Sequence, residues 1–184
     1  GPSIPIGVFK ERLYSRGDLM RFGSLSGERR RFMAEVTKAG ANMIAYGPTG
    51  SGKTTLIGAL IAEKEPAARL VIIEDTREIA VDMSRHENVV RAITSDHRDL
   101  RSLVRNALRQ APEHLIVGET RDATAFDLVQ SFITGQRGSL STIHANGPEN
   151  ALRRLTNTLR QDPAAPTEEP ARQMVSDAIH LLVW

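Results

Sequence analysis

The feature that most constrains this chain is a glycine-rich run of eight residues, Gly47 to Thr54, set between two apolar segments. It reads Gly-Pro-Thr-Gly-Ser-Gly-Lys-Thr and fits the pattern G-x-x-x-x-G-K-[ST] at every position. An apolar run at 42–46 precedes it, and apolar residues at helical spacing over 53–64 follow it. This context predicts a strand, a loop and a helix. The loop N–H groups would surround a phosphate, and the helix N-terminus would add positive potential.

Each residue type in this loop has a physical role. The glycines allow backbone conformations barred to other residues and let a ligand approach closely. Lys53 is predicted to place its charge on the β- and γ-phosphates, and Thr54 to offer its hydroxyl to Mg²⁺. A glycine-rich turn without a ligand is the alternative, and the flanking strand and helix argue against it. The predicted nucleotide-binding residues are Gly47, Pro48, Thr49, Gly50, Ser51, Gly52, Lys53, Thr54 and Thr55.

Apolar runs alternate with helical patterns along the rest of the chain. The 184 residues suit one domain with a real core. Strands this apolar, separated by helices, predict an α/β fold with a mostly parallel sheet and helices on both faces. The predicted strands are 42–46, 70–73, 89–93, 115–117, 139–143 and 181–184.

Polar side chains follow three of these strands, where ligands bind in open α/β sheets. Glu119 follows 115–117 and could support Mg²⁺, or it could cap the next helix. Three carboxylates follow 70–73 within five residues: Glu74, Asp75 and Glu78. Carboxylates this close either face a cation or form a solvated turn with an ion pair to Arg77. His144 follows 139–143 and could contact a γ-phosphate, or it could be structural. The other four histidines are interpreted as structural.

A further helix is predicted over 97–110, with Asp96 as its N-cap. Four arginines fall on its polar side at +3, +4 and +4 spacing, and form either a solvated face or a contact with a neighbouring subunit. They are Arg98, Arg101, Arg105 and Arg109.

Composition excludes several classes of protein. There is no cysteine, so disulfides and cysteine-based metal sites are ruled out. The formal net charge is +2 and aromatic residues make up 4%, which argues against direct nucleic-acid binding. No run approaches 18 apolar residues, so no membrane-spanning helix is expected.

The two ends of the chain carry separate expectations. Gly1-Pro2-Ser3 resembles the remnant of a removed tag, and residues 1–17 are predicted to be a linker or arm. The domain is predicted to occupy 18–184, with a helix start near Asp18. Residues 161–170 are rich in proline, alanine and acid, and predict an exposed loop.

Four blocks in this order resemble the secretion and traffic ATPases of type II and type IV secretion, conjugation and type IV pili. The likeness is strongest to the type IV secretion and conjugation ATPases and the tight-adherence pilus ATPases. It covers about residues 18–160. Gly47–Thr54 resembles the Walker A block, 74–78 the Asp box, 117–121 an atypical Walker B ending in glutamate, and 138–146 the His box.

The resemblance implies a RecA-like ATPase domain from a hexameric, cytoplasmic ring beside the inner membrane, whose separate N-terminal domain is absent from this sequence. It implies ATP and ADP as ligands, with Mg²⁺, and secretion or pilus machinery as partners. The implied catalytic residues are Lys53, Glu78 as candidate base, Glu119 and His144. The implied metal-site residues are Thr54, Glu119 and Asp75.

The sequence departs from the family before Walker B, where relatives often carry Arg-x-Arg-Pro-Asp-Arg. Here 109–114 reads Arg-Gln-Ala-Pro-Glu-His, and the position that can supply an arginine finger is missing. Arg109, Arg105 or Arg121 could substitute. Three functions therefore stay open: an ATP-driven motor, a nucleotide-binding regulatory subunit that hydrolyses negligibly, and a RecA-like nucleic-acid motor.

Overall fold

The computed structural model describes residues 26–184 and contains one six-stranded sheet. Its order is β3-β2-β4-β5-β1-β6, and all pairings between these strands are parallel. The predicted fold class and all six predicted strands are confirmed, with boundaries shifted by one residue at most. The strands are β1 (Met43–Gly47), β2 (Leu70–Glu74), β3 (Val89–Ile93), β4 (His114–Val117), β5 (Leu140–His144) and β6 (Leu181–Val183).

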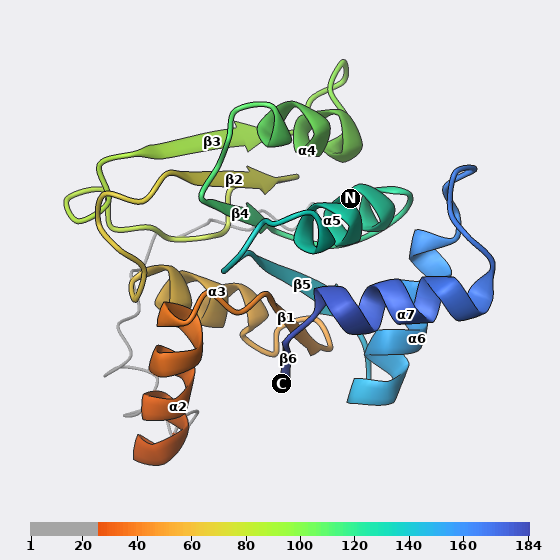
Figure 1. The fold of residues 1–184 in the computed structure, drawn as a ribbon. Coiled ribbons are helices and arrows are strands. Elements are labelled where there is room, and N and C mark those ends of the chain that lie inside the picture. Colours follow the sequence, from red (N-terminus) through yellow and green to blue (C-terminus); the bar gives the residue numbers. More distant parts are fainter. Residues whose placement is uncertain (1–25) are drawn as a thin grey trace, which may run out of the picture.

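Helices cover both faces of the sheet, because successive strand residues point to opposite sides. In β1, Met43 and Ala45 join the apolar cluster beneath α2 and α3, whereas Ile44 joins the larger cluster beneath α4, α5, α6 and α7. Figure 1 shows these two groups of helices on either side of the sheet. The helices are α2 (Gly27–Lys38), α3 (Lys53–Ile61), α4 (Leu100–Leu108), α5 (Thr124–Ile133), α6 (Pro148–Leu159) and α7 (Glu168–Ala178).

The strand order decides which loops meet. Strand β5 lies between β1, which carries the glycine-rich loop, and β4, which leads to Glu119. Because all the strands run in one direction, their carboxyl ends share one edge of the sheet. The residues after β1, β5, β4 and β2 therefore line up along that edge in this spatial order, which no local sequence pattern specifies.

The predicted arginine helix is shorter than expected and starts later. Asp99, not Asp96, is the N-cap, because its side chain accepts a hydrogen bond from the Ser102 N–H at 2.7 Å. Two backbone hydrogen bonds between Ser95 and Arg98 close a turn ahead of the helix. The prediction that four arginines share one side of this helix is therefore wrong, because only Arg101 and Arg105 belong to α4.

Arg101 and Arg105 also face their own subunit. Both contact the carboxylate of Asp127 on α5, and Arg101 reaches the buried Asp162 as well. Asp162 lies in the segment predicted to be an exposed loop, so that prediction holds only in part. Helix α7 takes up the end of the segment, from Glu168.

The expectations for residues 1–25 lie outside the described part of the chain. They comprise the tag remnant, the arm and the helix start near Asp18. Within residues 26–184, no helix is both long and apolar enough to cross a bilayer.

Candidate nucleotide-binding site

The loop between β1 and α3 has the backbone that its glycines allow. Gly50 and Gly52 lie at φ +76° and +88°, in the left-handed region. Gly52 is also the N-cap of α3, and no side chain caps this end. The first N–H groups of α3 are thus presented along the loop without a capping side chain, as an anion-binding helix N-terminus requires.

Gly47 is required by a close approach within the loop. Its φ is +152°, and a Cβ built there would lie 2.5 Å from the Ser51 Oγ. A larger residue would strain the backbone and displace the Ser51 side chain.

Lys53, at the first position of α3, turns its ammonium back toward the loop. Its Nζ donates to the carbonyl oxygens of Gly47 at 3.1 Å and Pro48 at 2.8 Å. Desolvation lowers the pKa of Lys53, and the charges of Glu119 and Glu78 oppose that effect. Lys53 therefore lies where the phosphate loop meets the acidic side of the site.

His144 lies between this lysine and the predicted Walker B acid. Its Nδ1 is 3.4 Å from Lys53 Nζ, and its Nε2 is 3.5 Å from Glu119 Oε1. The side chains of His144 and Glu119 are each about one-third exposed. Helix α5 instead begins after Ala123, with no side chain capping it. The alternative that Glu119 caps this helix is therefore wrong.

Glu74 has a different role from the acids that follow it. It is only 2% exposed, and its Oε1 accepts from the N–H groups of Glu78 and Ile79 at 2.9 and 2.7 Å. Arg91 of β3 pairs with its other oxygen and donates to the Ile79 carbonyl. Glu74 thus fixes the turn over 75–79, which carries Glu78 to the cavity.

Arg91 contributes to this turn, although it was not among the residues predicted from the sequence. The available signal was a single charge within the apolar run Val89–Ile93. A charge at such a position needs a partner, and the structure supplies Glu74 from the adjacent strand.

Asp75 ties together the ends of three strands. Its Oδ1 accepts from the Thr94 hydroxyl at 3.1 Å, and its Oδ2 lies 2.6 Å from an Arg121 nitrogen. Thr94 follows β3 and Arg121 follows β4. Arg121, one of the proposed substitutes for the arginine finger, is thus engaged within its own subunit. Arg105 is as well, through Asp127.

A cavity of about 220 Å³ opens where these elements meet. Thr76 and Thr142, which sequence analysis had not singled out, also line it. Thr142 donates to the Gly118 carbonyl at 2.6 Å and so joins β5 to the Walker B turn. The predicted residues that line the cavity are Thr49, Gly50, Lys53, Thr54, Asp75, Glu78, Glu119 and His144. Gly47, Pro48, Ser51, Gly52 and Thr55 shape the loop and the helix start without lining it.

The donor set of this cavity fits Mg²⁺ bound together with a nucleotide. Among the described residues, no three histidine or acidic side chains gather closely enough to hold a metal alone. Mg²⁺ is usually held by one or two protein oxygens together with substrate phosphates and water. The Thr54 hydroxyl and the Glu119 carboxylate supply such oxygens, and both line the cavity. Asp75 is less suited, because both its oxygens have partners.

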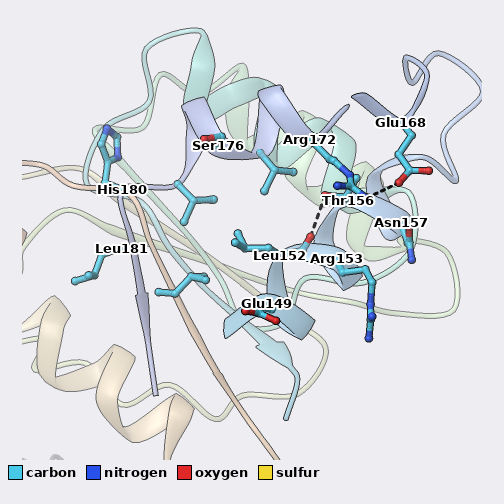
Figure 2. Close-up of a pocket in the computed structure, with 13 residues that line it drawn as sticks. Glu149, Leu152, Arg153, Thr156, Asn157, Glu168, Arg172, Ser176, His180 and Leu181 are labelled. Carbon is cyan, nitrogen blue, oxygen red and sulfur yellow. Dashed lines mark hydrogen bonds and ion pairs between the residues drawn. The ribbon is translucent and has the colours of Figure 1, made fainter. Parts of the chain in front are cut away.

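A larger hollow lies elsewhere, between α6, α7 and β6. Its volume is about 640 Å³, and none of the predicted site residues lines it. Its lining includes the apolar side chain of Val175. Leu152 and Leu181 also line it, together with the charged residues Arg172 and Glu168 (Figure 2). It has no phosphate loop or acid cluster, so the smaller cavity is the candidate functional site.

Comparison with known proteins identifies the family. The family model described as type II/IV secretion system protein matches residues 1–176. A conjugal transfer protein, TrbB, of Rhizobium radiobacter is 36% identical over 186 residues, covering all of this chain and 55% of the relative. The type IV secretion system protein PtlH of Bordetella pertussis is 38% identical over 137 residues, covering 72% and 40%. The chain spans about half the length of the curated relatives it matches.

A solved structure shares the fold. The crystal structure of the VirB11 ATPase from the Brucella suis type IV secretion system, in complex with sulphate, superposes with a TM-score of 0.79 at 26% identity. The match covers 89% of this chain and 47% of that one.

Proposed function

This chain belongs to the type II/IV secretion system protein family, and we propose that it binds Mg-ATP and hydrolyses it to ADP and phosphate. The observation that carries the proposal is the row Lys53, His144, Glu119. Their contacts of 3.4 and 3.5 Å place a cation, an imidazole and a carboxylate along one side of the cavity beside the phosphate loop. The sulphate bound to the Brucella VirB11 ATPase supports oxyanion binding by this fold.

The binding half of the reaction uses the loop and Lys53. The N–H groups at the start of α3 and the Lys53 ammonium bind the phosphates, and Lys53 exchanges its contacts with the Gly47 and Pro48 carbonyls for phosphate oxygens. Thr54 and Glu119 would hold Mg²⁺, which would supply positive charge to neutralise the phosphates. Asp75 lines the same cavity and contributes to the metal site indirectly, because its carboxylate pairs with Arg121 in the segment that follows Glu119.

The chemical half is in-line attack of water on the γ-phosphorus. The new P–O bond forms as the bond to the β,γ-bridging oxygen breaks, and the water proton passes to a carboxylate. Glu78 is the candidate base, since it lines the cavity on a turn that Glu74 fixes. Glu119 orients the water, and His144 contacts the γ-phosphate and registers its loss. Positioning and charge stabilisation supply most of the catalysis.

The wider role follows from the relatives and is part of the proposal. TrbB and PtlH are named for conjugal transfer and type IV secretion. We infer that the protein containing this chain works as a hexameric ring on the cytoplasmic side of the inner membrane. There its ATP cycle would drive secretion, conjugation or pilus assembly, without binding nucleic acid directly.

A regulatory subunit that binds nucleotide without hydrolysing it is the second candidate. This candidate is favoured because the arginines that could reach the nucleotide of a neighbouring subunit are already engaged within this chain or depart from the family pattern. Arg121 pairs with Asp75 and Arg105 with Asp127, and the sequence around Arg109 departs from the family pattern.

ATP turnover by the natural protein that contains this chain separates these candidates. It is measured over a range of protein concentrations, because ring assembly depends on concentration. Lys53→Ala and Glu119→Gln are expected to abolish turnover, while Lys38→Ala and Glu35→Gln on the exposed surface of α2 serve as matched controls. Tight ATP binding with no turnover at any concentration would contradict the motor and favour the regulatory subunit.

A further inference from the structure

Trp184 is the last residue of this chain and directly follows β6. Its side chain is 81% exposed. An indole has a large apolar π-face on which a flat ligand can stack.

Strand pairing places Trp184 beside the phosphate loop. Strand β6 runs parallel to β1 with Val183 opposite Ala45, so Trp184 comes level with Tyr46, the residue before the loop. A Cβ built on Gly47 would lie 3.5 Å from the Trp184 Cδ1 atom, which is van der Waals contact. The indole therefore adjoins the first residue of the loop that is proposed to bind phosphate.

The order of the strands gives the bound nucleotide a direction. On one side of β1 lies β5 with His144, and beyond it β4 leading to Glu119. On the other side lies β6 with Trp184. If hydrolysis takes place at the acidic side, the γ-phosphate lies toward His144 and Glu119. The other end of the nucleotide, which carries the base, then leaves the loop toward β6.

We propose that Trp184 is the platform on which the nucleotide base stacks. The inference rests on the proposed function, because it assumes that the phosphate loop holds a nucleotide. The indole offers a large π-face, and stacking uses the face of the base rather than its hydrogen-bonding edge. The platform therefore strengthens binding of any purine nucleotide and contributes little to the choice between adenine and guanine.

The titration uses this chain of 184 residues, in which Trp184 is the single tryptophan, so its fluorescence reports this position alone. Mg-ADP, Mg-ATP and inorganic tripolyphosphate are titrated into the protein. Tripolyphosphate has the phosphates but no base, and its binding is measured by calorimetry. We expect the nucleotides to quench Trp184 and tripolyphosphate to bind without quenching. Equal fluorescence changes for both kinds of ligand would show that Trp184 senses only the loop, and would overturn the platform.

Variants separate stacking from a structural role. Trp184→Ala is expected to weaken ADP binding about 5- to 150-fold, the range for loss of one base–aromatic stack, and to leave tripolyphosphate affinity unchanged. Trp184→Phe should restore most of the affinity, and Phe32→Ala, at another exposed aromatic, is the matched control. If Trp184→Ala weakens the binding of ADP and tripolyphosphate equally, or weakens neither, the proposal that Trp184 stacks on the base is contradicted.

Failure of the proposed function gives a different pattern. If neither tripolyphosphate nor nucleotide binds, the loop is not a phosphate site and the platform falls with it. If Lys53→Ala abolishes tripolyphosphate binding while Trp184→Ala changes nothing, only the platform fails.

Discussion

The two edges of the sheet carry polar side chains of similar kinds and arrange them differently. At the carboxyl edge, His144 lies 3.4 Å from Lys53 on one side and 3.5 Å from Glu119 on the other, partly open to solvent. At the amino edge, polar side chains are turned inward onto backbone groups. Lys64 donates to the Gly138 carbonyl, and His114 Nδ1 lies 2.9 Å from the Arg137 carbonyl.

Asn42 shows how fully the amino edge is satisfied. Its amide nitrogen donates to the carbonyls of Gln136 at 3.0 Å and Ala178 at 3.3 Å, and its amide oxygen accepts from the Ser139 N–H at 3.0 Å. One side chain thus joins the starts of β1 and β5 to the end of α7. Groups saturated in this way stabilise the fold, whereas long contacts around a cavity are available to a ligand.

The largest expected effect distinguishes two histidines at opposite edges. His144→Gln should lower ATP turnover by about 10²- to 10³-fold, the usual loss when one positioned transition-state contact is removed, with little change in stability. His114→Gln should leave turnover within about two-fold of the parent, because this ring contacts the Arg137 carbonyl far from the cavity. Steady-state ATPase assays and urea unfolding of both variants check this. Equal losses of turnover in the two variants would show that catalysis does not depend on the carboxyl edge alone.

The next effect concerns stability at the amino edge. Asn42→Ala leaves one N–H and two carbonyls without their partner, which is expected to cost about 3 kcal/mol of unfolding free energy. Glu119→Gln at the other edge should change that free energy by less than about 0.5 kcal/mol. Urea denaturation of the two variants makes the comparison. A larger loss of unfolding free energy for Glu119→Gln than for Asn42→Ala would show that the carboxyl edge, not the amino edge, stabilises the fold.

The smallest effect is a pH dependence at Lys64. Burial lowers the pKa of this lysine to about 8, so between pH 8 and 10.5 the unfolded chain binds more protons than the native one and stability rises with pH. Lys64→Met should remove a rise on the order of 2 kcal/mol between pH 7 and 10. The measurement is the difference between the parent and variant unfolding free energies at each pH. Parallel pH profiles would show that Lys64 is not the group responsible.

Much of the site was predictable because its signals are local. A polar residue directly after an apolar run marks a strand end, and this placed Glu119, His144 and the acids after β2 at one edge. The glycine-rich loop needs no distant partner to be identified. Strand order was not predictable in this way, because it depends on pairing between segments up to about 140 residues apart.

The features that the sequence did not predict correctly depend either on a choice between two similar nearby residues or on contacts with distant segments. Asp96 and Asp99 both suit an N-cap, and only the Ser102 N–H decides between them. In the sequence, Lys64 is a charged residue at the end of a predicted amphipathic helix, and nothing local marks it as buried. It is buried because Gly138 and His114, which lie far along the chain, pack near it. Trp184 was interpreted only as the end of a strand, since its neighbour Gly47 is reached through pairing with β1.

The position of β1 in the sheet has a consequence for biosynthesis. Among the six strands of the sheet, the one that carries the phosphate loop is synthesised first, yet its two neighbours, β5 and β6, are synthesised last. Until residue 140 and then residue 181 have been synthesised, β1 has no strand beside it, and such distant pairings form slowly. The phosphate loop is therefore expected to gain its two neighbouring strands, and the proposed site its His144, only late in synthesis.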